Sequence, residues 1–162
     1  MKRVSSGSPL EGQIGFSRAV RVGNFIAVAG TAPIPSDSTK VDTWSVYDQT
    51  RLCLQIVRKA IEEAGGHLES VIRTRIMLTD ISTWREAAQA HGECFANIKP
   101  VCTFVGVSGF IDPAWKVEVE ADCCMLDAST RASASLSEFA THILLPEGSL
   151  NNMISKKCSK EN

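Results

Sequence analysis

The segment from Ser45 to Gly66 constrains the fold more than any other part of this chain, because it is the clearest amphipathic helix. Ser45, with Asp48 three residues later, resembles a capping box, and Gly65-Gly66 is the kind of pair that ends a helix in the left-handed conformation. A helix with a continuous apolar stripe needs a second layer to cover it. The stripe consists of Val46, Thr50, Cys53, Leu54, Val57, Ile61 and Ala64.

Five other segments have the patterns of β-strands. One of them, 25–29, is apolar throughout, which predicts a strand that is covered on both faces. Gly23-Asn24 directly precedes it and predicts a tight turn, so the first two strands are expected to form a hairpin. The five predicted strands are 19–22, 25–29, 71–78, 101–107 and 116–122.

A second helix is expected between the third and fourth strands. It is predicted to begin near Ser82 or Thr83 and to be stopped by Pro100. His91 lies on its apolar side, where a hydrogen-bonded core histidine is the expected role. The order strand, strand, helix, strand, helix, strand, strand predicts a two-layer α+β fold with both helices on one face of the sheet.

The sheet face opposite the helices is where a site is expected. A partly apolar face of this size predicts self-association, which would bring its ionisable groups to a subunit boundary. Strand alternation is expected to place on this face Met77, Arg75, Cys102, Phe104, Gly106 and Glu118.

Composition excludes several classes of protein. With 162 residues, 44% of them hydrophobic, the chain is long enough for one folded domain and little more. A formal net charge of −1 argues against a protein that binds nucleic acid by neutralising phosphates. No apolar run approaches the ~20 residues that cross a bilayer, and the basic start lacks the apolar stretch of a signal peptide. A cytoplasmic location is therefore expected.

The six cysteines are expected to be structural thiols rather than a disulfide framework or a metal site. They include no Cys-x-x-Cys pair, and the three histidines are scattered along the chain. The sequence therefore predicts no metal centre.

The character of the chain changes at Asp127. Residues 1–126 are predicted to form the domain. Residues 127–162 are rich in small and polar residues and have a basic end, so they are predicted to be a partly disordered C-terminal extension.

Several stretches, in order along the chain, resemble the Rid (YjgF-type) family, whose members are also known as reactive intermediate deaminases and as L-PSP endoribonucleases. The resemblance implies a chorismate-mutase-like α+β fold, a mixed sheet with two helices on one face, and a homotrimer with clefts between subunits. It also implies hydrolysis of 2-imino acids to 2-keto acids and ammonia without a cofactor. The matching stretches are Gly15–Asn24, Val28–Pro33, Glu63-Ala64-Gly65, Val71–Thr74, Leu78-Thr79-Asp80 and Val117–Ala121.

The resemblance carries only part of the family's site onto this chain. Glu118 matches the water-activating carboxylate, and Gly30 matches a glycine whose backbone borders the cleft. The chain is similar to the Rid subgroups that lack the carboxylate-binding arginine. That arginine, in a Pro-x-Arg motif, and the family's Tyr, Ser and Asn are replaced here by Cys102, Phe16, Ala29 and Ala88.

Two roles are open for each charged candidate. Glu118 is either a general base or one acid of a solvated strand face. Arg75 either replaces the missing anion anchor or forms a salt bridge. Cys102 is expected to be a small side chain in the cleft rather than a nucleophile, because no neighbouring base is identifiable in the sequence.

The first functional hypothesis is a small-molecule hydrolase, an imine or enamine deaminase, that works in the clefts of a homotrimer. The second is a non-catalytic family member that binds a metabolite or a partner. The third, RNA cleavage, is disfavoured by the net charge and by an aromatic content of 6%. Beside Glu118, Arg75 and Cys102, the candidate substrate-binding residues are Phe16, Gly30, Thr31 and Phe104.

Overall fold

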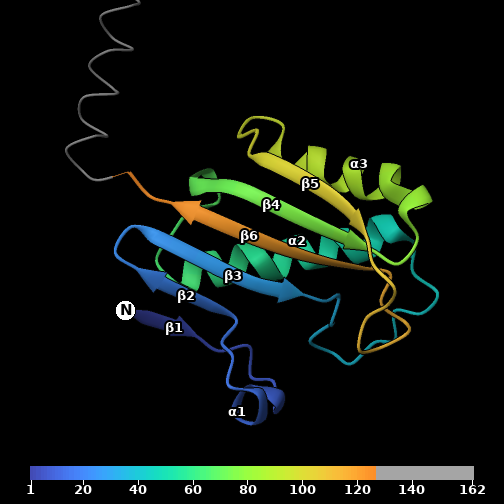
Figure 1. Cartoon of the computed structure of the whole chain (residues 1–162), viewed down its shortest axis with the longest axis horizontal. Coiled ribbons are helices and arrows are strands. Elements are labelled where there is room, and N and C mark those ends of the chain that lie inside the picture. Colours follow the sequence, from blue (N-terminus) through green and yellow to red (C-terminus); the bar gives the residue numbers. More distant parts are fainter. Residues whose placement is uncertain (127–162) are drawn as a thin grey trace, which may run out of the picture. The chain divides into compact units, whose positions relative to one another are not determined.

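The computed structural model describes residues 1–126, and the predicted C-terminal extension, 127–162, lies outside the described residues. The described chain forms a six-stranded sheet with the strand order β1-β2-β3-β6-β4-β5 (Figure 1). Two short 3-10 turns, η1 (Leu68–Ser70) and η2 (Ile81–Thr83), precede β4 and α3. The helices and strands are β1 (Lys2–Val4), α1 (Leu10–Ile14), β2 (Ala19–Val22), β3 (Phe25–Thr31), α2 (Val46–Glu63), β4 (Val71–Leu78), α3 (Trp84–Phe95), β5 (Val101–Gly106) and β6 (Val117–Cys124).

The sheet is mixed, as expected for the predicted fold class. Strands β4 and β5 are parallel and are joined through α3, whereas all other neighbouring strands are antiparallel. The predicted order of strands and helices is confirmed. The sequence did not predict β1 and α1, because segments of 3 and 5 residues are too short to show a periodicity.

The helices α2 and α3 pack on the same face of the sheet (Figure 1). Strand residues that point toward them alternate with residues that point to the other face, which we call the open face. The apolar stripe of α2 is buried as predicted, and it lies over the central strands β6 and β3. The largest apolar side chains that are fully buried are Ile26, Val57, Ile61, Ile76, Leu78, Phe95, Val117 and Val119.

Local residues define both ends of α2. The Ser45 hydroxyl accepts a hydrogen bond from the Asp48 backbone N–H at 3.0 Å, which caps the N-terminus. That hydroxyl also donates to the Asp48 carboxylate at 2.6 Å. After the helix, Gly65 has the expected left-handed conformation, with φ 83°. The Arg21 guanidinium donates to the carbonyls of Ala64 and Gly65 there, which satisfies acceptors that the helix leaves open.

The strand register overturns the prediction that Cys102, Phe104 and Gly106 lie on the open face. They stand beside Thr74, Ile76 and Leu78 of β4, which are buried under the helices. Neighbouring residues in register point to the same side of a sheet, so these β5 residues belong to the helix side. Phe104 accordingly packs edge-on against Trp84 of α3, with ring centroids 6.1 Å apart. The open face of β5 carries Val101, Thr103 and Val105 instead.

Two further expectations differ from the structure. The strand β3 is covered on one face only, because Ile26 and Val28 are buried whereas Phe25 and Ala27 are exposed. Although the residues of this run are all apolar, they alternate between the buried and the exposed face of the sheet. The second helix ends at Phe95 rather than at Pro100, and the backbone turns through Lys99, which has a left-handed φ of 54°.

The side chain of Gln49 connects three parts of the fold. It lies on α2, is fully buried, and donates from Nε2 to the carbonyls of Val41 at 2.8 Å and Ala114 at 3.0 Å. Its Oε1 accepts from the Lys116 backbone N–H at 2.8 Å. Gln49 thus connects the loop before α2 and the loop before β6 to the core.

We expect Gln49→Leu to lower the free energy of unfolding by about 2–3 kcal/mol, because it leaves backbone groups without hydrogen-bond partners. Urea denaturation followed by circular dichroism measures this change. Gln55→Leu, on the exposed side of the same helix, is the control and should change the unfolding free energy by less than about 0.5 kcal/mol. Equal effects of the two substitutions would contradict the role of Gln49.

Candidate functional site

A β-bulge shapes the open face between β3 and β6. Val28 stands opposite Ala121, and Thr31 stands opposite Val119, so two residues of β3 share the space opposite Glu120. Those two residues are Ala29 and Gly30. A bulge of this kind bends its strand and changes the direction of the side chains beside it.

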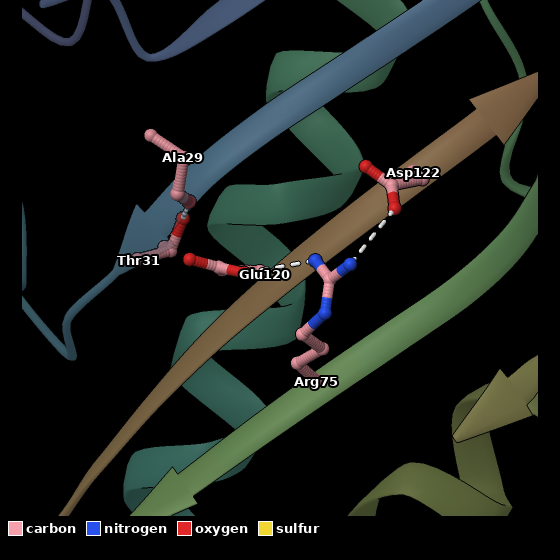
Figure 2. Close-up of polar contacts among 5 residues, drawn as sticks. All are labelled: Ala29, Thr31, Arg75, Glu120 and Asp122. Carbon is pink, nitrogen blue, oxygen red and sulfur yellow. Dashed lines mark hydrogen bonds and ion pairs between the residues drawn. The ribbon is translucent and has the colours of Figure 1, made fainter. Parts of the chain in front are cut away.

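Arg18 fixes the backbone of this bulge. Its Nη1 donates to the Gly30 carbonyl and to Thr31 Oγ1, both at 2.9 Å. The Thr31 hydroxyl, which is fully buried, in turn donates to the Ala29 carbonyl at 2.8 Å (Figure 2). The conformation of Ala29, Gly30 and Thr31 is therefore held by a connected set of hydrogen bonds.

Glu118 lies against the bulge. It is a half-buried residue of β6 on the open face, and a Cβ atom at position 30 would lie 2.9 Å from its Oε2 atom. A side chain at position 30 would displace the carboxylate, so the glycine provides the space that the carboxylate occupies. Gly30, Thr31 and Glu118, which the sequence analysis proposed as site residues, are thus close together.

Burial raises the pKa of Glu118 above the usual range of glutamates. The positive charge of Arg18 opposes this shift of the pKa, and the negative charge of Glu120 adds to it. Burial also lowers the pKa of Arg18, although a guanidinium remains charged at every pH at which proteins are folded. Glu118 is therefore a carboxylate whose proton affinity depends on one neighbouring cation.

Arg75 is engaged by two carboxylates. Its Nη1 atom lies 3.0 Å from Glu120 Oε2, and its Nη2 atom lies 3.7 Å from Asp122 Oδ2 (Figure 2). Glu120 is its cross-strand neighbour in the register of β4 and β6. The guanidinium thus forms the salt bridge that was one of its two predicted roles, and its role as an anion anchor stays a prediction.

The remaining candidates lie elsewhere in the described chain. Cys102 and Phe104 are on the helix side of β5, across the sheet from Glu118. Phe16 is half-buried in the segment between α1 and β2, two residues before Arg18. A ring nitrogen of His91 lies 2.9 Å from Thr74 Oγ1, so the predicted hydrogen bond is present, although the histidine is half-buried at the edge of the core rather than inside it.

Sequence reasoning missed Arg18. Its only signal was a charged residue directly before an alternating strand, inside a stretch already noted for its family resemblance. The groups it binds are 12 and 13 residues further along the chain. Only the pairing of β2 with β3 brings them within reach.

Residues 1–126 contain no group of three or more histidine, cysteine, aspartate or glutamate side chains that could hold a metal ion. Their five cysteines are free thiols. None of the helices in this part of the chain has the length and hydropathy needed to span a membrane.

We expect Arg18→Gln to raise the pKa of Glu118 further, because the substitution removes the cation that favours the ionised carboxylate. A carbon-13 NMR titration of the side-chain carboxyl measures the pKa. The folded state holds this proton more tightly than the unfolded chain does. The free energy of unfolding therefore falls as the pH rises from the ordinary glutamate pKa to the pKa of Glu118 in the folded protein. The variant should widen this pH range, because it raises the pKa in the folded protein. Arg73→Gln, also on the open face, is the control; an equal shift there would contradict a specific effect of Arg18.

Comparison with known proteins gives a consistent result. The family profile described as Endoribonuclease L-PSP matches residues 8–124. An uncharacterised protein of Streptomyces coelicolor is 39% identical over 122 residues, which are 75% of this chain and 90% of that protein. A RutC family protein of Pyrococcus abyssi is 31% identical over 93 residues, which are 57% of this chain and 73% of that protein.

A solved structure agrees with these matches. It is that of Rv2704 from Mycobacterium tuberculosis, described as a member of the highly conserved YjgF/YER057c/UK114 family. It is similar with a TM-score of 0.69 and 42% identity, over 76% of this chain and 98% of that chain. The match to the family profile, over residues 8–124, includes both the bulge and Glu118. Because it covers most of the sequence, the chain belongs to the Endoribonuclease L-PSP family, the Rid or YjgF-type proteins.

Proposed function

We propose that this protein is a small-molecule hydrolase that acts on the C=N bond of imines or their enamine tautomers. The observation that carries the proposal is the Glu118 carboxylate, which is half-buried against Gly30 and has a raised pKa. A carboxylate whose pKa lies closer to neutrality is a better proton shuttle at physiological pH. Membership in the family supports the same reaction class.

The reaction needs water and one group that moves protons. The oxygen of a water molecule attacks the C=N carbon while Glu118 takes a proton from that water. Glu118 then delivers the proton to the nitrogen, which gives a carbinolamine. It then takes the hydroxyl proton and delivers it to the nitrogen as the C–N bond breaks. Ammonia leaves, a carbonyl forms, and Glu118 returns to its ionised state, so the reaction consumes one water and needs no redox partner.

We place this chemistry in clefts between the subunits of a homotrimer. The open face of one chain leaves apolar side chains exposed, among them Phe25 at 44%, Val101 at 62% and Val105 at 41%. Burial against another copy would remove this surface from water. Glu118 and Cys102 occupy positions that the family resemblance assigns to one cleft, yet they lie on opposite faces of this sheet. A cleft that contains both must therefore use two copies.

We expect sedimentation equilibrium to give three times the chain mass of 17.5 kDa. The expected reason is that the exposed apolar side chains of the open face are buried between copies. A mass equal to that of one chain at micromolar concentration would contradict the placement of the site between subunits.

A non-catalytic binding protein is the alternative. The substitution of the family's arginine by Cys102 favours it, because an anionic substrate loses a charged hydrogen-bonding partner worth ~1.5–3 kcal/mol. RNA cleavage receives no support from the site, since the open face of β6 carries the three acids Glu118, Glu120 and Asp122, which repel phosphates.

We expect Glu118→Gln to lower the rate of imine hydrolysis by about a hundredfold or more, because glutamine cannot accept the proton of water. The assay follows carbonyl product from freshly generated imines, with and without a carboxylate group, above the rate in buffer. Glu69→Gln, an exposed acid of η1, is the matched control and should keep wild-type turnover. Unchanged turnover in Glu118→Gln would remove this residue from the mechanism, and wild-type protein that binds but never accelerates hydrolysis would favour the alternative.

A further inference from the structure

We infer that Glu11 is a positioning residue of the site: it draws the Arg18 guanidinium away from Glu118 and leaves that carboxylate free to accept a proton from water. The inference rests on the proposed function for the reaction in which Glu118 takes part. It depends on how the segment that precedes β2 is connected to the bulge and to β6.

The Glu11 carboxylate is held by the loop between β1 and α1. Ser5 Oγ donates to one of its oxygens, and Ser6 donates to the other through both its backbone N–H and its hydroxyl. These hydrogen bonds, with that from Ser5 contributing most, lower the pKa of Glu11, so the side chain stays ionised. Glu11 is therefore a negative charge that is fixed in place.

Arg18 is anchored to the same loop. Its backbone N–H donates at 2.9 Å to the carbonyl of Val4, which directly precedes Ser5. The Arg18 carbonyl in turn accepts from the Ala29 N–H of the bulge at 3.0 Å. Glu11 and Arg18 thus meet at the end of β1, and the charge of Glu11 acts on Arg18 more strongly than that of any other acid.

Arg18 lies near Glu118 without pairing with it. Its Nη1 atom donates to the Gly30 carbonyl, and a Cβ atom on Gly30 would lie 2.9 Å from Glu118 Oε2, so both charged groups border the same glycine. Within residues 1–126, however, Arg18 forms an ion pair with neither Glu118 nor Glu11. The strand order places the two acids on opposite sides of it, since Glu11 is held at the end of β1 and Glu118 is on β6, beyond β3. Two opposing attractions keep the guanidinium between them.

Removing the charge of Glu11 would upset this balance. The hydrogen bonds from Nη1 to Gly30 and Thr31 keep the Arg18 guanidinium at the bulge, so it does not leave when Glu11 is neutral. It then lies closer to Glu118 and stabilises the ionised carboxylate more strongly. A carboxylate in an ion pair is a weaker base, so the step in which Glu118 takes a proton from water becomes slower.

The other ionisable groups around Glu118 do not change in the comparisons below. Besides burial, which has the largest effect, Glu120 raises the pKa of Glu118, and Arg75 of β4 is paired with Glu120. Cys53 of α2 is buried, which raises the pKa of its thiol and keeps it neutral. Groups that a second copy brings to the site are also constant, because every measurement uses the assembled, full-length protein.

Two substitutions with opposite effects test the inference. We expect Glu11→Gln to lower the pKa of Glu118, measured by carbon-13 NMR titration of its carboxyl group, whereas Arg18→Gln raises it. The acid limb of the pH profile of kcat/KM for imine hydrolysis should move in the same two directions. At neutral pH, Glu11→Gln should lower kcat about threefold or more and change KM by less than about twofold. Glu69→Gln is the matched control and should leave the pKa of Glu118 and the rate unchanged.

A double variant, Glu11→Gln with Arg18→Gln, shows whether Glu11 acts through Arg18. We expect it to have the same Glu118 pKa and the same acid limb as Arg18→Gln alone, because the cation that Glu11 attracts is gone. If Glu11→Gln has the same effect with and without Arg18, the inference is overturned. An unchanged or raised pKa of Glu118 in the single variant Glu11→Gln would overturn it as well.

A second variant covers the case in which Glu11→Gln does not fold, which circular dichroism detects. Ser5→Ala with Ser6→Ala removes the two hydroxyl groups that hold Glu11 and keeps the charges of Glu11 and Arg18. It should also lower the pKa of Glu118, because Glu11 is no longer fixed beside Arg18. An unchanged pKa of Glu118 in this folded variant would contradict the role of Glu11.

The two measurements separate this inference from the proposed function. If the pKa of Glu118 shifts as expected but no imine is hydrolysed, the hydrolase proposal fails and the link between Glu11 and Glu118 stands. If imines are hydrolysed and Glu11→Gln changes neither the pKa nor the pH profile, the hydrolase proposal stands and the inference is overturned.

Discussion

The packing of α2 against the central strand β6 is the interaction on which the rest of this structure depends. Alternate residues of β6 are buried beneath the helix, and this burial turns the intervening acids, Glu118 among them, to the open face. Gln49 adds a polar restraint, since its three hydrogen bonds hold the loops that lead into α2 and β6. The apolar contacts of the helix thus determine where the chemistry of the chain lies.

The polar groups of the open face depend on one another. Arg18 holds the bulge, Gly30 leaves space for the Glu118 carboxylate, and burial there raises the pKa of that carboxylate. Arg75 is held by two acids, Glu120 and Asp122, which orient its guanidinium on the open face. The result is a proton-accepting carboxylate on the open face, held beside the bulge that Arg18 stabilises.

Much of the fold was predictable because its signals are local. The spacing of apolar residues, Ser45 at one end of α2 and Gly65 at the other specify that helix within one stretch of sequence. The face of β5 was not predictable in this way. Alternation divides a strand into two sets of residues but does not say which set meets the helices, and only the pairing of Phe104 with Ile76 decides it.

The sequence by itself determined the α+β class, the order of most elements, the family and the position of Glu118, because these follow from periodicity, helix-end residues and contiguous motifs. Only the tertiary structure decided that Arg18 holds the bulge, that Arg75 forms ion pairs with Glu120 and Asp122, and that Cys102 lies across the sheet from Glu118. Those relations join strands that are distant in the chain. Their charges and hydrogen bonds exist only once the register of the sheet is set.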